Sequence, residues 1–199
     1  MSRLVLASSN RGKLAELREL LAASGHELLA QSDFDVGDAD ETGATFVENA
    51  LIKARHAALA TGLPALADDS GLVVDALDGE PGLRSARYSG RHGNDAANNA
   101  LLLDRLRNVP EAARGAHFYC VLVMLRSASD PQPLIAEGLW RGRILSAPRG
   151  ANGFGYDPLF LPDGYDISSA ELDPALKNAN SHRGQALARL RERLARAEL

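Results

Sequence analysis

Several residue types are scarce in this chain, and each scarcity excludes a class of protein. Cys120 is the single cysteine, so no disulfide can form within the chain, which is typical of a reducing cytoplasm. It stands in a strand-like apolar run, which favours a buried apolar side chain over a reactive thiol. No apolar run approaches the roughly 20 residues of a membrane-spanning helix, and the apolar start is too short for a signal peptide. We therefore expect a cytoplasmic protein without a membrane partner.

Clusters of basic residues are also missing. The formal net charge is −4 and no run of Lys and Arg occurs, which argues against a nucleic-acid partner. All but three of the 22 basic residues are arginine, and the lysines are Lys13, Lys53 and Lys177. Such a chain can keep lysine where a compact point charge is needed, for example against a phosphate. Genome bias and chance are the alternative explanation.

The pattern of apolar residues predicts an α/β protein. With 199 residues, and neither a repeat nor a linker to divide it, the chain is expected to form a single domain over 1–199, made of two lobes around a well-buried core. Helices that flank a mixed sheet define the class. Strands are predicted at 4–7, 65–67, 72–74, 116–126 and 134–145, the last two as an antiparallel pair, and helices from Leu14 to about Gly25, at 45–60, at 94–107 and from His182 onward.

Asp68 and Asp69 are adjacent carboxylates between apolar runs, in the stretch ADDSGLVVD. Ligands collect at the strand ends of open α/β sheets, and two close anions raise each other's pKa unless a cation compensates. The pair therefore predicts a site for Mg²⁺ or for a lysine, with the loop acids Asp40 and Glu41 as candidates for a second metal ligand. The alternative is a solvated turn before Ser70.

Three further segments have the composition of a ligand site. The polar loop Ser8–Lys13 lies between a strand and a helix, and the unpaired amides of a helix N-terminus favour anions; an ordinary helix cap is the alternative. His182 and Arg183 place two donors in the first turn of a predicted helix. Phe154 offers a ring on which a purine can stack, and Asp157 a carboxylate that accepts its N–H; a loop that plugs the edge of the core is the alternative.

Taken in order, five of these segments resemble the inosine/xanthosine triphosphate pyrophosphatase family, and within it the bacterial branch. The matching segments are LASSNRGKLAEL, ETGATFVENALIKA, ADDSGLVVDALDGEPGLRSARYSG, GFGYDP and SHRGQAL, which extend from Leu4 to Leu187. The resemblance implies an elongated α/β fold with a nucleotide cleft between two lobes, assembled as a homodimer. It also implies Mg²⁺-dependent hydrolysis of ITP, dITP and XTP to the monophosphate and pyrophosphate, which keeps deaminated purines out of DNA and RNA.

The same resemblance implies roles for individual residues. Asp69 is expected to be the catalytic proton acceptor and a metal-linked carboxylate, with Glu41 or its neighbour Asp40 as the other acid. His182 and Arg183 are expected to donate to the carbonyl at C6 of hypoxanthine or xanthine, where adenine presents a donor instead. The substrate-binding set is Ser8, Ser9, Asn10, Arg11, Gly12, Lys13, Lys53 and Lys177 for the triphosphate, and Ser70, Phe154, Gly155, Tyr156, Asp157, His182 and Arg183 for the remainder.

The sequence departs from the family pattern at a few positions, and two other functions stay open. Ser8–Ser9 stands where relatives often have Thr and Gly, Leu176 where an acid is common, and Asn180 where an apolar residue is common. The last two affect the expected placement of Lys177. The alternatives are a related pyrophosphatase for modified pyrimidines or methylated bases, and a nucleotide-binding regulator without turnover.

Overall fold

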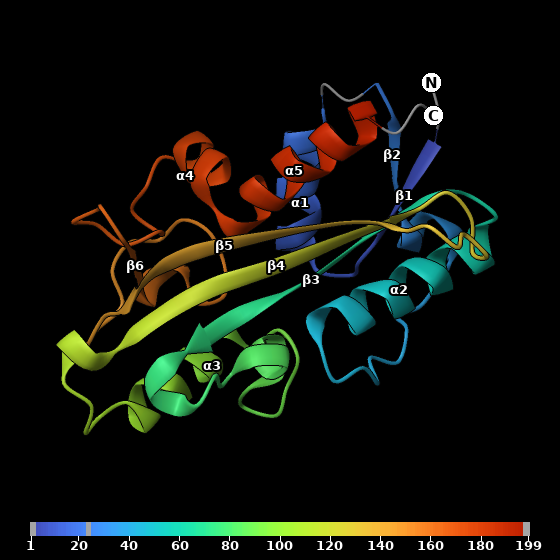
Figure 1. Ribbon diagram of the computed structural model, residues 1–199. Helices are drawn as coiled ribbons and strands as arrows, with labels where there is room; N and C mark the ends of the chain where they lie inside the picture. Colours follow the sequence, from blue (N-terminus) through green and yellow to red (C-terminus); the bar gives the residue numbers. More distant parts are fainter. Residues whose placement is uncertain (1–2, 23–24, 197–199) are drawn as a thin grey trace. The chain divides into compact units, whose positions relative to one another are not determined.

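A computed structural model describes residues 3–22 and 25–196 and confirms the α/β class. Its strands form one six-stranded sheet in the order β2-β1-β3-β4-β5-β6 (Figure 1). β1 is parallel to both β2 and β3, whereas β5 and β6 are antiparallel, so the sheet is mixed. The strands are β1 (Arg3–Ala7), β2 (Glu27–Ala30), β3 (Ala65–Val74), β4 (Gly115–Leu125), β5 (Leu134–Ile144) and β6 (Phe160–Pro162).

The chain forms two compact units, and each unit is made of segments that are separate in the sequence. The first unit comprises Met1–Asp69, Cys120–Gly138 and Arg183–Leu199, and the second comprises Ser70–Tyr119 and Leu139–His182. Strands β3, β4 and β5 each run from one unit into the other. The expectation of one domain with two lobes and a cleft stays a prediction.

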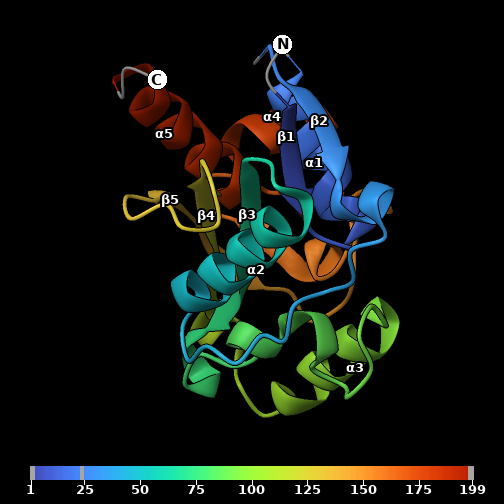
Figure 2. The same cartoon turned by 90° about the vertical axis from the view of Figure 1, so that its right-hand side faces the viewer.

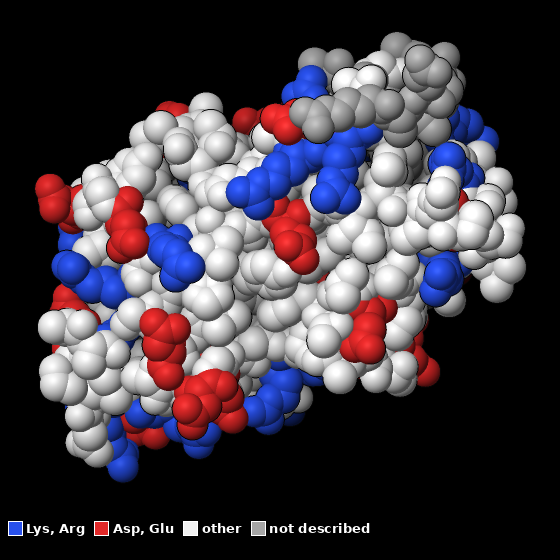
Figure 3. All heavy atoms as spheres, in the orientation of Figure 1, with Lys and Arg blue, Asp and Glu red and all other residues white. Residues whose placement is uncertain are grey.

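In the first unit, helices cover both faces of the sheet. α1 (Arg11–Leu21) and α5 (His182–Arg196) lie on one face, and α2 (Phe46–Thr61) lies on the other (Figures 1 and 2). Successive side chains of a strand point to opposite faces, so Leu4 and Leu6 of β1 join α1 and α5 in one core cluster. α5 buries Leu187 and Leu190, and Figure 3 shows basic side chains gathered over this helix.

The second unit has its own core around aromatic residues. The rings of Phe118 and Phe160 meet edge to face at 4.7 Å between centroids, and Trp140 lies 5.4 Å from Phe160. Leu102 of α3 (Asp95–Arg105) is fully buried in the same cluster. The remaining helix, α4 (Pro174–Asn180), precedes α5 directly.

The predicted helices and long strands are confirmed, but the prediction for β3 contains an error that matters for the site. Sequence analysis separated 65–67 from 72–74, whereas β3 continues from Ala65 to Val74 and includes Asp68 and Asp69. The acids are therefore neither at a strand end nor in a turn. Sequence analysis missed the short elements β2, β6 and α4. Within the described residues, no helix combines the length and apolar character needed to cross a bilayer.

A buried leucine of α1 and an exposed leucine of α2 allow a direct test of the core of the first unit. Leu17 is 1% exposed inside the first unit's cluster, whereas Leu59 on α2 is 77% exposed. We expect Leu17→Ala to lower the free energy of unfolding by about 2–5 kcal/mol, because it removes buried apolar surface and leaves a cavity. Leu59→Ala should change it by less than about 0.5 kcal/mol. Urea unfolding followed by far-UV circular dichroism measures both, and equal effects would contradict the packing described.

Candidate active site

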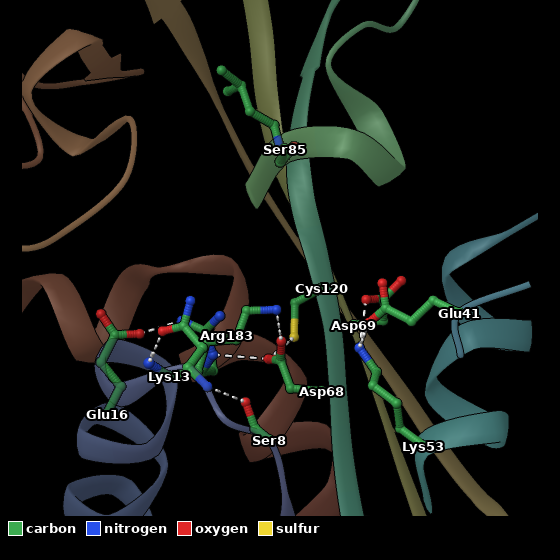
Figure 4. Close-up of polar contacts among 12 residues, drawn as sticks. Ser8, Lys13, Glu16, Glu41, Lys53, Asp68, Asp69, Ser85, Cys120 and Arg183 are labelled. Carbon is green, nitrogen blue, oxygen red and sulfur yellow. Dashed lines mark hydrogen bonds and ion pairs between the residues drawn. The ribbon is translucent and has the colours of Figure 1, made fainter. Parts of the chain in front are cut away.

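Asp68 and Asp69 point to opposite faces of β3 because side chains alternate along a strand. Figure 4 shows Asp68 on the side of α1 and α5, and Asp69 on the side of α2. Both residues are buried, because Asp68 is 1% exposed and Asp69 is 7% exposed. An ionised carboxylate is costly to bury unless it is paired and hydrogen-bonded, so each face must provide cations.

On the first face, Asp68 is the centre of a buried ion cluster. Its Oδ1 lies 2.7 Å from Lys13 Nζ, and its Oδ2 lies 2.8 Å from Arg183 Nε. The Cys120 thiol donates to the same Oδ2 at 3.1 Å, and Glu16 pairs with the other side of Arg183. Burial by itself raises the pKa of Asp68, but Arg183 and Lys13 outweigh it and hold that pKa well below the ordinary value. Asp68 is therefore a permanent anion.

On the second face, Lys53 joins two carboxylates. Its Nζ donates to Asp69 Oδ1 at 2.6 Å and to Glu41 Oε1 at 2.9 Å. Burial favours the neutral amine, but Asp69 and Glu41 outweigh it and raise the pKa of Lys53. Burial raises the pKa of Asp69 as well, and Lys53 and Lys13 only partly offset this. Asp69 is thus the more basic of the two adjacent acids, which suits a proton acceptor.

The predicted phosphate loop forms the start of α1. Asn10 is the helix cap, and its Oδ1 accepts from the Lys13 amide at 3.0 Å. Ser8 Oγ accepts from the Asn10 amide at 3.2 Å, and Ser9 Oγ donates to Asp38 at 2.7 Å. The helix begins at Arg11, so Arg11, Gly12 and Lys13 form its first turn rather than a preceding loop. The segment does form a helix cap, and the first-turn amides of Arg11 and Gly12 are directed out of the helix end. Phosphate binding by these residues stays a prediction.

The acidic loop that carries Glu41 is fixed on both sides of that residue. Asp38 accepts from Gln31 Nε2 at 2.7 Å as well as from Ser9. Beyond Glu41, the Gly43 amide donates to Asn49 Oδ1 at 2.8 Å. The start of α2 follows, where the Glu48 amide donates to Thr45 Oγ and the Glu48 carboxylate accepts from the Thr45 hydroxyl and the Ala44 amide.

The donor set on the second face fits a magnesium ion. Mg²⁺ takes one or two protein carboxylates and completes its octahedron with water and phosphate oxygens. Glu41 and Asp69 are two such carboxylates, and both contact the Lys53 ammonium. Among the described residues, no group of three or more His, Cys, Asp or Glu side chains is arranged to hold a metal. Asp40 is exposed, whereas Glu41 faces Asp69 in Figure 4.

In the second unit, Asp157 organises the predicted purine loop. Its Oδ2 accepts from Lys177 Nζ at 2.6 Å and from the Phe154 amide at 2.9 Å, while its Oδ1 accepts from Ser169 Oγ at 3.0 Å. Asp157 is only 4% exposed, so both of its oxygens serve the loop itself. The Phe154 ring is half-buried and lies 5.3 Å from the Lys177 ammonium. Tyr156 is buried and donates to Ser85 O at 2.9 Å, as expected for a residue that plugs the core.

The remaining predicted residues lie along β3 and at the start of α5. Ser70 continues β3 beyond Asp69 and is half-buried. The His182 ring stacks on Phe118, with 4.8 Å between centroids and 12° between planes. Arg183 is 1% exposed and fixed between Asp68 and Glu16, which raises its pKa further. The expectation that Cys120 is buried is confirmed. Burial raises the pKa of its thiol well above the ordinary value, and Asp68 adds to this.

Sequence reasoning missed Glu16 and Asp38, and it treated Asp68 and Asp69 as one site at a strand end. The two-residue period of a strand would have separated the two acids, had β3 been recognised as continuous. Glu16 lies five positions before Leu21 in an amphipathic helix and has no local signal for its distant partner Arg183.

Comparison with known proteins gives a consistent assignment. The Ham1 family model matches residues 4–193. The dITP/XTP pyrophosphatase of Xanthomonas oryzae pv. oryzae is 61% identical over 98% of both chains, and that of Vibrio cholerae is 53% identical over 96% of this chain and 95% of its own. The solved HAM1 protein of Coxiella burnetii has a TM-score of 0.90 at 51% identity, with 99% of this chain and 100% of that chain covered. The Staphylococcus aureus Ham1 protein has a TM-score of 0.86 at 37% identity, with the same coverage.

The buried cluster around Asp68 generates a stability prediction. We expect Asp68→Asn to lower the free energy of unfolding by about 3–5 kcal/mol, because it leaves buried Arg183 and Lys13 without their shared anion. Asp104→Asn makes the same chemical change in an exposed ion pair with Arg107 and should cost at most about 1 kcal/mol. Urea unfolding of both variants measures the difference. Equal losses would show that Asp68 is not the counter-ion of the cluster.

Proposed function

The chain belongs to the Ham1 family, and from this premise we propose that it is a nucleoside triphosphate pyrophosphatase. It hydrolyses deaminated purine nucleotides, namely ITP, dITP and XTP, to the nucleoside monophosphate and pyrophosphate, and so keeps them out of DNA and RNA. The observation that carries the proposal is the buried trio of Glu41, Lys53 and Asp69, which provides a proton acceptor, a cation and a metal-compatible carboxylate pair at one point of β3.

The reaction requires charge neutralisation and positioning more than covalent chemistry. Asp69, with its raised pKa, orients and deprotonates a water molecule for attack on the α-phosphorus. Lys13, whose charge also acts on Asp69, neutralises the leaving pyrophosphate together with the first-turn amides of α1. Lys53 holds Asp69 and Glu41 close together. A Mg²⁺ ion held by Glu41 and Asp69 supplies electrostatic stabilisation of the phosphate oxygens when it is bound.

Phe154, His182 and Arg183 recognise the base in this proposal. Phe154 provides the stacking ring, and Asp157 and Lys177 hold the loop that carries it. His182 and Arg183 donate to the carbonyl at C6. Adenine presents an amino donor at that position, and a site built for an acceptor rejects such an analogue by about 10⁴-fold or more.

The assembly and location follow from the same premise. We propose a homodimer in the cytoplasm, in line with the family resemblance and with the single, buried cysteine. The proposed partner is a small-molecule nucleotide, with no nucleic-acid or membrane partner.

Substitution of single acids tests the proposed roles. We expect Asp69→Asn to reduce kcat for dITP by at least about 100-fold, because it removes the general base. Glu41→Gln should reduce turnover strongly and raise the Mg²⁺ concentration needed for half-maximal rate. Asp40→Asn is the matched control, since Asp40 is the exposed neighbour of Glu41, and its turnover should stay within about twofold of the parent chain. Near-normal turnover of Asp69→Asn would refute the assignment.

A panel of nucleotides tests the reaction itself. ITP, dITP, XTP, ATP, GTP and dTTP are each incubated with the chain and Mg²⁺, and pyrophosphate and orthophosphate are measured separately. We expect pyrophosphate from the three deaminated purines, little release from ATP, and no release in EDTA. Preference for dTTP would favour the modified-pyrimidine alternative, tight binding without any release would favour a regulator, and orthophosphate would exclude attack at the α-phosphorus.

A further inference from the structure

Two polar residues of α3 hold the backbone of the purine loop, and neither belongs to the site described above. Asp95 Oδ2 accepts from the Gly155 amide at 2.7 Å. Asn99 Nδ2 donates to the carbonyl oxygen of the same glycine at 2.9 Å. Residues four positions apart lie on one face of a helix, so one turn of α3 engages both polar groups of a single loop residue.

The loop needs external restraint because its own backbone is permissive. Gly150, Gly153 and Gly155 all have positive φ, at +80°, +77° and +62°. Glycine loses more conformational freedom on ordering than any other residue, so a loop with three of them is costly to hold in one shape. Asp157 holds the Phe154 amide, and Asp95 with Asn99 holds the next residue, Gly155.

The bonding state of Asn99 indicates what its carboxamide is for. Its Oδ1 is buried and has no hydrogen-bond partner among the described residues. A buried acceptor without a donor destabilises a fold, and an apolar side chain of similar size would avoid that loss. The bond from Nδ2 to Gly155 is the interaction that only the polar side chain can make.

We propose that Asp95 and Asn99 are positioning residues that set the orientation of the Phe154 ring for a purine base. We call the two residues, with their bonds to Gly155, the clamp. This inference rests on the proposed function, because it makes base binding the quantity that the clamp controls. Neither residue touches the reacting atoms in this proposal. Loss of the clamp therefore weakens interactions with the base in the ground state and the transition state alike, which raises KM and leaves kcat nearly unchanged.

The experiment compares Asp95→Ala, Asp95→Asn and Asn99→Ala in the full chain. Asparagine at 95 retains an oxygen that accepts from Gly155, although it removes the negative charge that favours the first turn of a helix. A purely helical role for Asp95 would therefore make Asn as harmful as Ala. Asp104→Ala on the same helix is the control, since its exposed ion pair with Arg107 lies outside the clamp.

Four measurements separate the loss of these two contacts from general damage. Hydrogen exchange of the Gly155 amide reports its bond to Asp95, without any need for turnover. Binding of IMP reports a ligand with a base, and inhibition by inorganic tripolyphosphate reports a ligand without one. Steady-state kinetics with dITP separate KM from kcat.

We expect Asp95→Ala to accelerate exchange of the Gly155 amide by about 10-fold or more, as for a charge-assisted bond of ordinary strength. The Kd for IMP and the KM for dITP should rise by about 10-fold in Asp95→Ala and Asn99→Ala. Tripolyphosphate inhibition and kcat should stay within about twofold, and Asp95→Asn should recover most of the loss. Because both residues hold one glycine, the double alanine variant should lose less than the product of the single effects.

Two results would overturn the proposal. One is faster Gly155 exchange with unchanged IMP binding, and the other is an equal loss for IMP and tripolyphosphate. Failure of the wild-type chain to release pyrophosphate from dITP would instead refute the proposed function, whereas the exchange and binding results would still decide whether the clamp exists and what it controls.

Discussion

The site depends on the alternation of side chains along one strand. Because Asp68 and Asp69 are adjacent in β3, the strand directs them to opposite faces of the sheet, and each carboxylate meets a lysine within 2.7 Å. The same two acids in a turn would share one environment and raise each other's pKa. The strand instead gives them different environments. Asp68 is held ionised by Arg183 and Lys13, and Asp69 becomes the more basic acid through burial.

This arrangement divides labour between structure and chemistry. Asp68 joins β3 to α1 through Lys13 and to α5 through Arg183, so the position of Lys13 is coupled to the packing of both helices. Asp69 is the next residue of the same strand, so the packing that fixes β3 also fixes the position of Asp69. Catalytic groups on regular elements are held more precisely than groups on loops. Glu41, which does lie on a loop, is fixed by hydrogen bonds on either side of it.

Much of the fold and part of the site followed from the sequence. Helical periodicity gave α2 and α3 within a few residues, and motif order identified Lys13, Lys53 and Asp69. Local patterns failed where partners are remote in sequence. The apolar runs on either side of Asp68 suggested two separate strands, because nothing in the local sequence shows how a buried acid is neutralised. The cations that neutralise it come from positions 13 and 183. No local signal indicates that Asp68 and Glu16 enclose the guanidinium of Arg183, and its proposed contact with the substrate comes from motif order alone.

The scarcity of lysine has a physical explanation in these contacts. Each of the three lysines is largely buried and forms an ion pair of 2.6 or 2.7 Å with an aspartate: Lys13 with Asp68, Lys53 with Asp69 and Lys177 with Asp157. An ammonium is a point charge whose three donors rotate freely, whereas a guanidinium is a fixed planar fork. A lysine can therefore keep one aspartate contact and direct another donor to an incoming phosphate. Arg183 differs, because its planar fork suits two carboxylates on fixed sides. In the proposed reaction Lys13 uses the freedom of its ammonium, because it keeps its contact with Asp68 while it neutralises the leaving pyrophosphate.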